Sequence, residues 1–204
     1  MLETDVRSAL LDAADELLAR FGYRKTTIED VARAAGVGKG TVYLHFGSKQ
    51  ELALATIDRL VDRVVERLEA IAAGAEGAAA KLRAMLVARV LIRFDAVARS
   101  LASLDELLGA IRPALLERRK RWFEREARVL ARVLAAAPEL DVPRPDRTAR
   151  DLLAATDAFL PYSLTAAETG RRAAIHAQLG RIADLLISGL LHHPPTTATD
   201  ERRP

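Results

Sequence analysis

The chain has 204 residues, half of them hydrophobic and few of them aromatic, and it contains no cysteine. The lack of cysteine excludes disulfides, thiolate metal sites and cysteine nucleophiles. The formal net charge is only +3, so the basic pI near 9.5 is a weak indication of nucleic-acid binding. Abundant Ala, Leu and Arg favour helices, and we expect an all-α fold. We see no signal peptide and no membrane-length apolar run, and we therefore expect a cytoplasmic protein.

The first expected helix starts at Thr4 as its N-cap and ends at Gly22. Its apolar residues recur at helical spacing between Val6 and Phe21. Arg7, close to the start of this helix, has two interpretations: a contact to DNA or an ordinary solvated arginine.

Residues 26–49 carry the most informative pattern. Thr26 with Glu29 fits a capping box, which begins a short helix. Gly36 ends that helix in a tight turn that favours positive φ. A second short helix is expected over residues 39–46, with Val42 and Phe46 on one face, and Ser48 with Glu51 predicts another capping box. Two short helices joined by a glycine turn predict a helix-turn-helix, which binds DNA.

The distribution of charge supports DNA binding more than the total charge does. Residues 31–49 contain no Asp or Glu, whereas residues 1–50 hold seven basic and seven acidic residues. An acid-free surface with hydroxyls and cations suits phosphates, and the N-terminus of a recognition helix enters the major groove. His45 is either a phosphate contact or a surface residue. The predicted DNA-binding residues are Thr26, Thr27, Gly38, Lys39, Gly40, Thr41, Tyr43, His45 and Lys49.

The runs TTIEDVA and GVGKGTVYLHFGSKQEL, within about residues 5–55, resemble the DNA-binding domain of the TetR family of bacterial transcriptional regulators. The sequence departs from the family pattern at Gly38, where a serine often caps the recognition helix. The resemblance implies a homodimer that binds a palindromic DNA operator. It also implies an all-helical C-terminal domain that binds a small-molecule inducer.

The rest of the chain predicts a helical body. We expect a domain boundary near residue 48, with a DNA-binding domain over 1–47, a ligand-binding and dimerisation domain over 48–192 and a disordered tail over 193–204. Pro113 is predicted to separate two helices, and Pro161 to kink a later one. The expected helices of the body span 48–73, 78–100, 103–111, 113–137, 146–168 and 171–191.

Charged residues interrupt the apolar faces of two of these helices. Arg89 and Arg93 lie four residues apart, and they either pair with a neighbouring acid or line a cavity for an acidic ligand. Residues 112–132 carry eight basic and three acidic residues, which indicates a solvated face or a site for an acyl-coenzyme A. The candidate pocket residues are Met85, Arg89, Arg93, Phe94, Arg119, Trp122, Phe123, Glu126, Phe159 and Tyr162.

Together these features predict a ligand-responsive transcriptional regulator, a repressor that a small hydrophobic, acidic or acyl-CoA-like inducer releases from DNA. The last two helices are expected to form the homodimer interface. The sequence contains no nucleophile elbow, phosphate loop or metal-spaced cluster, so we expect no enzyme activity, cofactor, metal or membrane partner. Control by a protein partner instead of a small ligand is the alternative.

Overall fold

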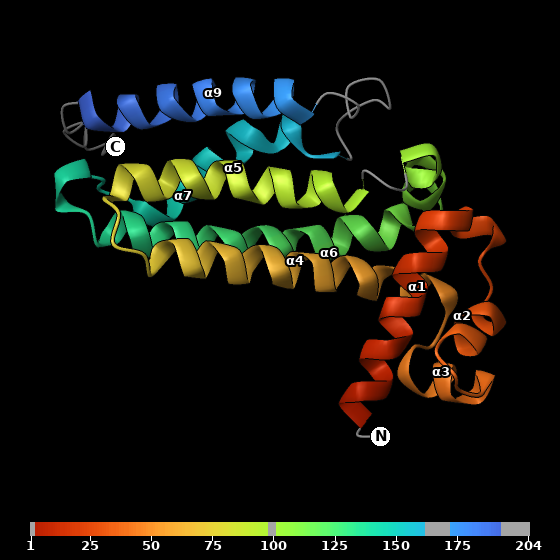
Figure 1. Cartoon of the computed structure of the whole chain (residues 1–204). Coiled ribbons are helices and arrows are strands. Elements are labelled where there is room, and N and C mark those ends of the chain that lie inside the picture. Colours follow the sequence, from red (N-terminus) through yellow and green to blue (C-terminus); the bar gives the residue numbers. More distant parts are fainter. Residues whose placement is uncertain (1–2, 98–100, 162–171, 193–204) are drawn as a thin grey trace, which may run out of the picture.

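The computed structural model describes residues 3–97, 101–161 and 172–192, and within these ranges the regular structure is helical without strands. Figure 1 shows α1–α3 grouped at one end of an elongated body of roughly aligned helices. The helices of the body are α4 (Lys49–Ala72), α5 (Ala78–Val97), α6 (Leu101–Ala135), α7 (Pro145–Thr156) and α9 (Arg172–His192), with two 3₁₀ turns, η1 (Pro138–Leu140) and η2 (Asp157–Phe159).

The N-terminal group consists of α1 (Glu3–Lys25), α2 (Ile28–Ala34) and α3 (Lys39–His45). Its core joins these helices to the first turns of α4, as the helix-turn-helix prediction requires. Helix α1 is interrupted at Gly22, which has a φ of 79°, and it already includes Thr4. The buried residues of this core are Leu10, Leu11, Ala13, Ala14, Ile28, Val31, Ala32, Val42, Phe46, Leu52 and Ala55.

The capping box of α2 lies one residue later than the sequence predicted. Thr27 is the N-cap, its side chain accepts from the Asp30 amide, and the Asp30 carboxylate accepts from the Thr27 amide. Thr26 is buried instead, and its hydroxyl donates to the carbonyl of Gly22 at 2.8 Å. The predicted box of Thr26 with Glu29 is therefore wrong, and the helix begins one residue later than that box implied.

The turn between α2 and α3 follows the prediction. Gly36 has a φ of 69°, and the added Cβ of a larger residue would meet nothing within 4 Å. Backbone conformation, not space, therefore favours glycine there. Ser48 caps α4 by accepting from the Glu51 amide, but the Glu51 carboxylate binds Arg118 of α6 instead.

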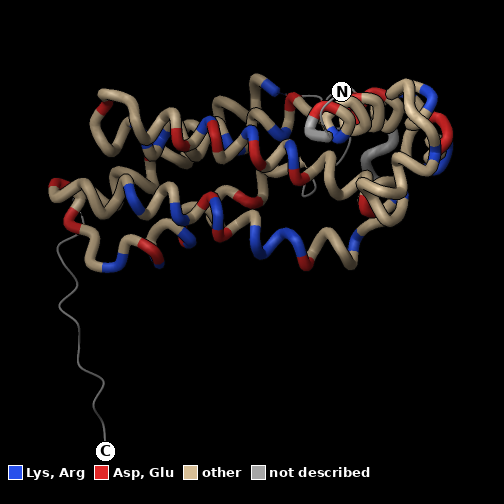
Figure 2. The backbone as a smooth tube through the Cα atoms, turned by 90° about the horizontal axis from the view of Figure 1, so that it is seen from below, with Lys and Arg blue, Asp and Glu red and all other residues tan. Residues whose placement is uncertain are grey.

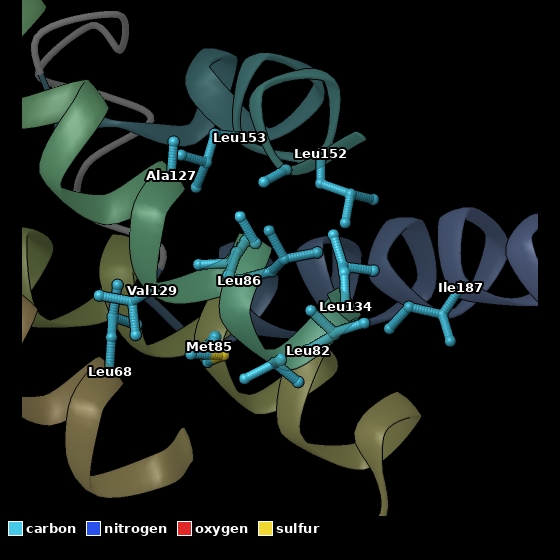
Figure 3. Packing of buried hydrophobic residues seen from close by; sticks show 14 of the residues in the cluster. Leu68, Leu82, Met85, Leu86, Ala127, Val129, Leu134, Leu152, Leu153 and Ile187 are labelled. Carbon is cyan, nitrogen blue, oxygen red and sulfur yellow. The ribbon is translucent and has the colours of Figure 1, made fainter. Parts of the chain in front are cut away.

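The body packs α4, α5, α6, α7 and α9 around one hydrophobic core (Figure 3). Helices α5 and α6 lie between α4 on one side and α7 and α9 on the other (Figure 1). A smaller cluster of buried residues connects the second half of α5 to η2 and α9. Leu82, Met85 and Leu86 of α5 and Leu134 of α6 are among the residues that are almost completely buried in the main core.

The effects of Pro113 and Pro161 on the helices differ from the sequence prediction. Helix α6 continues through Pro113, which lacks the amide that would bond to the Gly109 carbonyl. Gly109 and Pro113 are both exposed, so water can solvate that carbonyl, and packing of the flanking segments against α1 and α4 holds the helix together. Helix α7 ends at Thr156, and Leu160 is extended, as expected for a residue before proline. Pro161 therefore follows a helix end and not a kink.

Some predictions concern residues outside the described ranges. They are the disordered tail at 193–204, the pocket residue Tyr162, and the parts of the expected helices that fall on residues 98–100, 162–168 and 171. Figure 2 shows basic and acidic residues interspersed along the helices without a large region of one sign. The distribution of charge therefore does not locate a binding surface, and the surface has to be identified from the geometry of α3.

Candidate nucleic-acid interface

Helix α3 is held by one face and exposes the other. Val42 and Phe46 are buried in the N-terminal core, at 0% and 4% exposure. Lys39, Gly40, Tyr43 and Leu44 are exposed, while Thr41 and His45 are half-buried. Gly38 is the N-cap without a side-chain bond, and its carbonyl accepts from the Thr41 amide at 3.0 Å. The first turn of α3 thus presents backbone and side chains to an incoming partner.

Lys39 lies in an exposed ion pair at the start of α3. Its ammonium donates to Glu29 of α2 at 2.6 Å. The hydrogen bond with Glu29 raises the pKa of Lys39, and the same bond lowers the pKa of Glu29. Both groups are therefore charged at neutral pH. The ammonium has three N–H donors, so Lys39 can donate to a phosphate while it remains paired with Glu29.

The residues predicted at the mouths of α2 and α4 have different roles. Thr27 is exposed, whereas the burial of Thr26 removes its hydroxyl from the surface, so Thr26 is not a phosphate contact. Lys49 donates to the Arg24 carbonyl at 3.3 Å, and its ammonium lies 4.3 Å from the centroid of the Tyr23 ring. Burial lowers the pKa of Lys49. Lys49 therefore connects α4 to the end of α1.

Two other side chains belong to this surface. The Arg7 guanidinium lies 5.3 Å from the centroid of the Phe46 ring and is exposed beside α3. Leu44 was not among the predicted contacts, although it is 86% exposed. The signal was present in the sequence, because Leu44 lies two residues from the buried Val42 and hence nearly opposite it on a helix.

Comparison with known proteins identifies the family to which the N-terminal helices belong. Residues 10–56 match the family described as "Bacterial regulatory proteins, tetR family". The N-terminal domain is a TetR-family DNA-binding domain. The match ends near the beginning of α4, so it covers the helix-turn-helix and little of the body.

The chain is also similar to curated transcriptional and metabolic regulators. The chain is 43% identical over 65 residues to the regulator AlkX of Mycobacterium tuberculosis, covering 32% of this chain and 31% of AlkX. It is 33% identical over 60 residues to the "Fatty acid metabolism regulator protein" of Bacillus subtilis, covering 29% and 31% of the two chains. The chain therefore aligns with about a third of the length of these relatives.

The body also has the TetR-family fold. A crystal structure of a TetR/AcrR-family regulator from Thermobifida fusca superposes with a TM-score of 0.55 and 26% identity, covering 90% of this chain and 97% of that one. The two-part, all-helical architecture predicted from the sequence is thereby confirmed.

The predicted ligand pocket is largely an ion-pair network inside the body. Arg89 is 1% exposed and donates to Glu126 at 2.8 Å and to Asp157 at 3.0 Å. It also donates to the Thr156 hydroxyl at 2.9 Å, and Arg93 donates to Glu126 at 2.5 Å. Burial raises the pKa of Glu126, but the charges of Arg93 and Arg89 outweigh it and hold this pKa below its usual range. The arginines therefore pair with neighbouring acids, which was the simpler of the two predicted interpretations.

The other predicted pocket residues lie around this network. Arg119 donates to the second oxygen of Asp157 at 2.8 Å. Trp122 is buried, and its indole N–H donates to Asp58 of α4 at 2.7 Å. The remaining described members, Met85, Phe94, Phe123 and Phe159, pack in the hydrophobic clusters. None of the described members lines a cavity of about 1150 Å³ that lies elsewhere in the structure.

That cavity, of about 1150 Å³, lies where α1 meets the body. Apolar side chains of α1, α4, α5 and α6 contribute to its wall, and charged side chains surround them. Arg59 of α4 crosses its edge to Asp12 and Asp15 of α1, each at 2.6 Å. The lining residues are Asp12, Asp15, Glu16, Leu18, Ala19, Arg20, Tyr23, Thr56, Ile57, Arg59, Leu60, Arg63, Ile92, Asp95, Ala96, Val97 and Leu107. Sequence reasoning missed this site because it depends on how α1 docks on α4 and α5.

Helix α9 presents a second exposed apolar surface. By length and composition alone it is apolar enough to cross a membrane, a property that core helices of folded proteins share. Only 28% of its most apolar stretch is buried within the chain, and Leu185 is 73% exposed. An apolar helix left open in this way is suited to pack against another protein surface.

Proposed function

We propose that this protein is a DNA-binding transcriptional regulator that acts as a homodimer and whose DNA affinity depends on a small ligand. The observation that carries this proposal is the presentation of α3: its buried face anchors it to the N-terminal core, and its opposite face is open to a DNA groove. The TetR-family match over residues 10–56 supports it independently.

DNA recognition divides between backbone and base contacts. Lys39, Thr27 and Arg7 are exposed around α3 and suit phosphates, which fix the position of a protein on DNA. Tyr43 is exposed on α3 and Thr41 is half-buried, and we assign both to contacts with base edges. His45 and Gly38, at the two ends of α3, complete the proposed surface.

The partner for α9 is proposed to be a second copy of this chain. Two α9 helices packed against each other would bury the apolar surface that one protomer leaves open. In the dimer the two α3 helices would lie about 34–36 Å apart, one turn of DNA, and would bind the two halves of a palindrome.

The ligand is proposed to occupy the cavity between α1 and the body instead of the pocket predicted from the sequence. The predicted pocket holds ion pairs, in which Arg89 and Arg93 bind Glu126 and have no need of an acidic ligand. The cavity instead combines the apolar Leu60 and Ile92 with the exposed Arg63. Such a wall suits a hydrophobic molecule with an acidic group. The cavity touches both parts of the fold, so a ligand that fits only one arrangement would shift the dimer between DNA-binding and released states, as in a repressor.

The experiment begins by selecting duplexes from a random pool with the purified protein. Fluorescence anisotropy then compares wild type with Thr41→Ala and Tyr43→Ala. Loss of base contacts is expected to weaken binding by about tenfold or more. The matched control is Arg147→Ala, an exposed cation on α7 of the body. Affinities of the two α3 variants equal to that of the control would refute the assignment of α3.

A separate experiment tests the ligand. A thermal-shift screen compares lipophilic acids and their acyl-coenzyme A thioesters with neutral analogues of equal chain length. We expect the acids to raise the melting temperature of the wild type, and Arg63→Gln to reduce the shift. Equal shifts for acidic and neutral compounds would contradict the proposed role of Arg63.

A further inference from the structure

Gly40 and Leu44 form the edge of α3 that faces away from the protein core. At 100° per residue, Gly40 and Leu44 each lie about 160° from the buried Val42, and they are one helical turn apart. They therefore form the ridge of α3 that projects farthest from the protein. The ridge consists of a glycine followed by a leucine that is 86% exposed.

Gly40 is not required by the fold of the protein. Its φ lies outside the positive range that favours glycine, and a Cβ added there would meet nothing within 4 Å. Glycine inside a helix also costs stability relative to alanine. The missing side chain does leave room for another molecule to come close to the backbone of α3.

An exposed leucine alone is common on protein surfaces. The position of Leu44 is what distinguishes it. Among the described residues, the two most exposed large apolar side chains are Leu44 and Leu185, and each belongs to one of the two helices proposed to bind a partner. In the major groove, the apolar group available to a leucine is the C5 methyl of thymine.

We propose that Leu44 is a specificity-determining residue that contacts a thymine methyl in each half of the DNA site, with Gly40 providing the clearance that this contact needs. The inference rests on the proposed function, because it assumes that α3 enters the major groove. It predicts a thymine at one fixed position of each half-site, and it assigns the preference for that base to an apolar contact and not to a hydrogen bond.

The test is a cycle in which the methyl group and the leucine are removed separately and together. Each thymine of a selected duplex is replaced in turn by deoxyuridine, which removes only the C5 methyl and keeps base pairing. At one position per half-site, methyl removal is expected to weaken wild-type binding about fourfold. The same replacement should leave the affinity of Leu44→Ala unchanged. Measurements at reduced salt keep weakened binding detectable.

The outcomes separate the two proposals. If no duplex is bound above background, the proposed function fails. If duplexes are bound and Thr41→Ala or Tyr43→Ala weakens binding, but methyl removal acts equally on wild type and Leu44→Ala, only the role of Leu44 is overturned. A selected half-site without thymine overturns it as well.

Gly40→Ala provides a second, independent measurement. The alanine is expected to raise the melting temperature slightly, because it stabilises a helix, and to weaken DNA binding, because its methyl fills the clearance. Opposite signs for stability and DNA affinity support the inference. A variant that is more stable and binds DNA as tightly as wild type would contradict the role of Gly40.

Discussion

Replacing Glu126 by glutamine is expected to destabilise the body far more than any nearby surface change. The carboxylate is 1% exposed and accepts from both Arg89 and Arg93. In Glu126→Gln the shape is preserved, and one oxygen can still accept. Arg89 also keeps Asp157 at 3.0 Å and Arg93 keeps the Arg89 carbonyl at 2.9 Å, but the negative charge that both guanidinium groups share is lost.

The size of the effect follows from what remains paired. Removing one partner of a buried ion pair costs about 3–5 kcal/mol, and the surviving contacts of Arg89 place this case at the lower end. For a chain of this length, a loss of about 3 kcal/mol lowers the melting temperature by about 6–12 °C. Melting is followed by circular dichroism at one fixed protein concentration, because the proposed dimerisation would make the melting temperature concentration-dependent.

Glu124→Gln is the matched control on the same helix. Glu124 pairs with Arg150 at 2.9 Å, but both side chains are nearly half exposed. Such pairs contribute about 0–1 kcal/mol, so the melting temperature should change by no more than a few degrees. Equal effects of the two substitutions would refute the assignment of Glu126 to a buried, stabilising network.

The pH dependence supplies a second check on the same residue. The pKa of Glu126 is lowered in the folded protein, so the stability it contributes is complete above the pKa of the unfolded state, about 4.3. This stability is lost as pH falls through the lower folded pKa. The difference in unfolding free energy between wild type and Glu126→Gln should thus be full at pH 7 and shrink below about pH 4.3. A difference that grows in acid would contradict the reasoning.

Three further substitutions test local features of the fold by thermal melting. Gly36→Ala is expected to cost about 1–2 kcal/mol because of the φ of 69°, and unchanged melting would show that this turn relaxes. Trp122→Phe removes the N–H that binds Asp58 at 2.7 Å, at a cost of about 1–3 kcal/mol; a gain in stability would contradict that bond. Thr27→Ala removes the cap of α2, costing about 1 kcal/mol, and no loss would argue against the observed capping box.

The N-terminal domain could be predicted closely because its signals are local. Gly36 is required by one turn, and the pair Val42 and Phe46 identifies the buried face of α3 within a few residues. Local sequence could not decide which of the two adjacent threonines caps α2. Thr26 is buried because α1 continues past Gly22 and leaves its hydroxyl facing a main-chain carbonyl, so Thr27 becomes the cap.

Several features of the helical body depend on contacts between residues far apart in the sequence, which local patterns do not predict. The arginines of α5 were recognised as unusual, but their partners Glu126 and Asp157 are 37 and 68 residues from Arg89 along the chain. Pro113 was predicted to end a helix on local grounds, yet packing on both sides keeps α6 continuous. Neither a long-range pairing nor the cavity beside α1 leaves a periodic pattern in the sequence, and both had to be read from the structure.

The central claim is that two copies of α3 bind one palindromic DNA site. Hydroxyl-radical footprinting on a selected duplex tests it most directly, because it reports which sugars the bound protein covers. The account predicts two symmetric protected regions on one face of the duplex, centred about one helical turn apart, and their loss with Tyr43→Ala. A single protected region, or the same protection in Tyr43→Ala as in wild type, would contradict it.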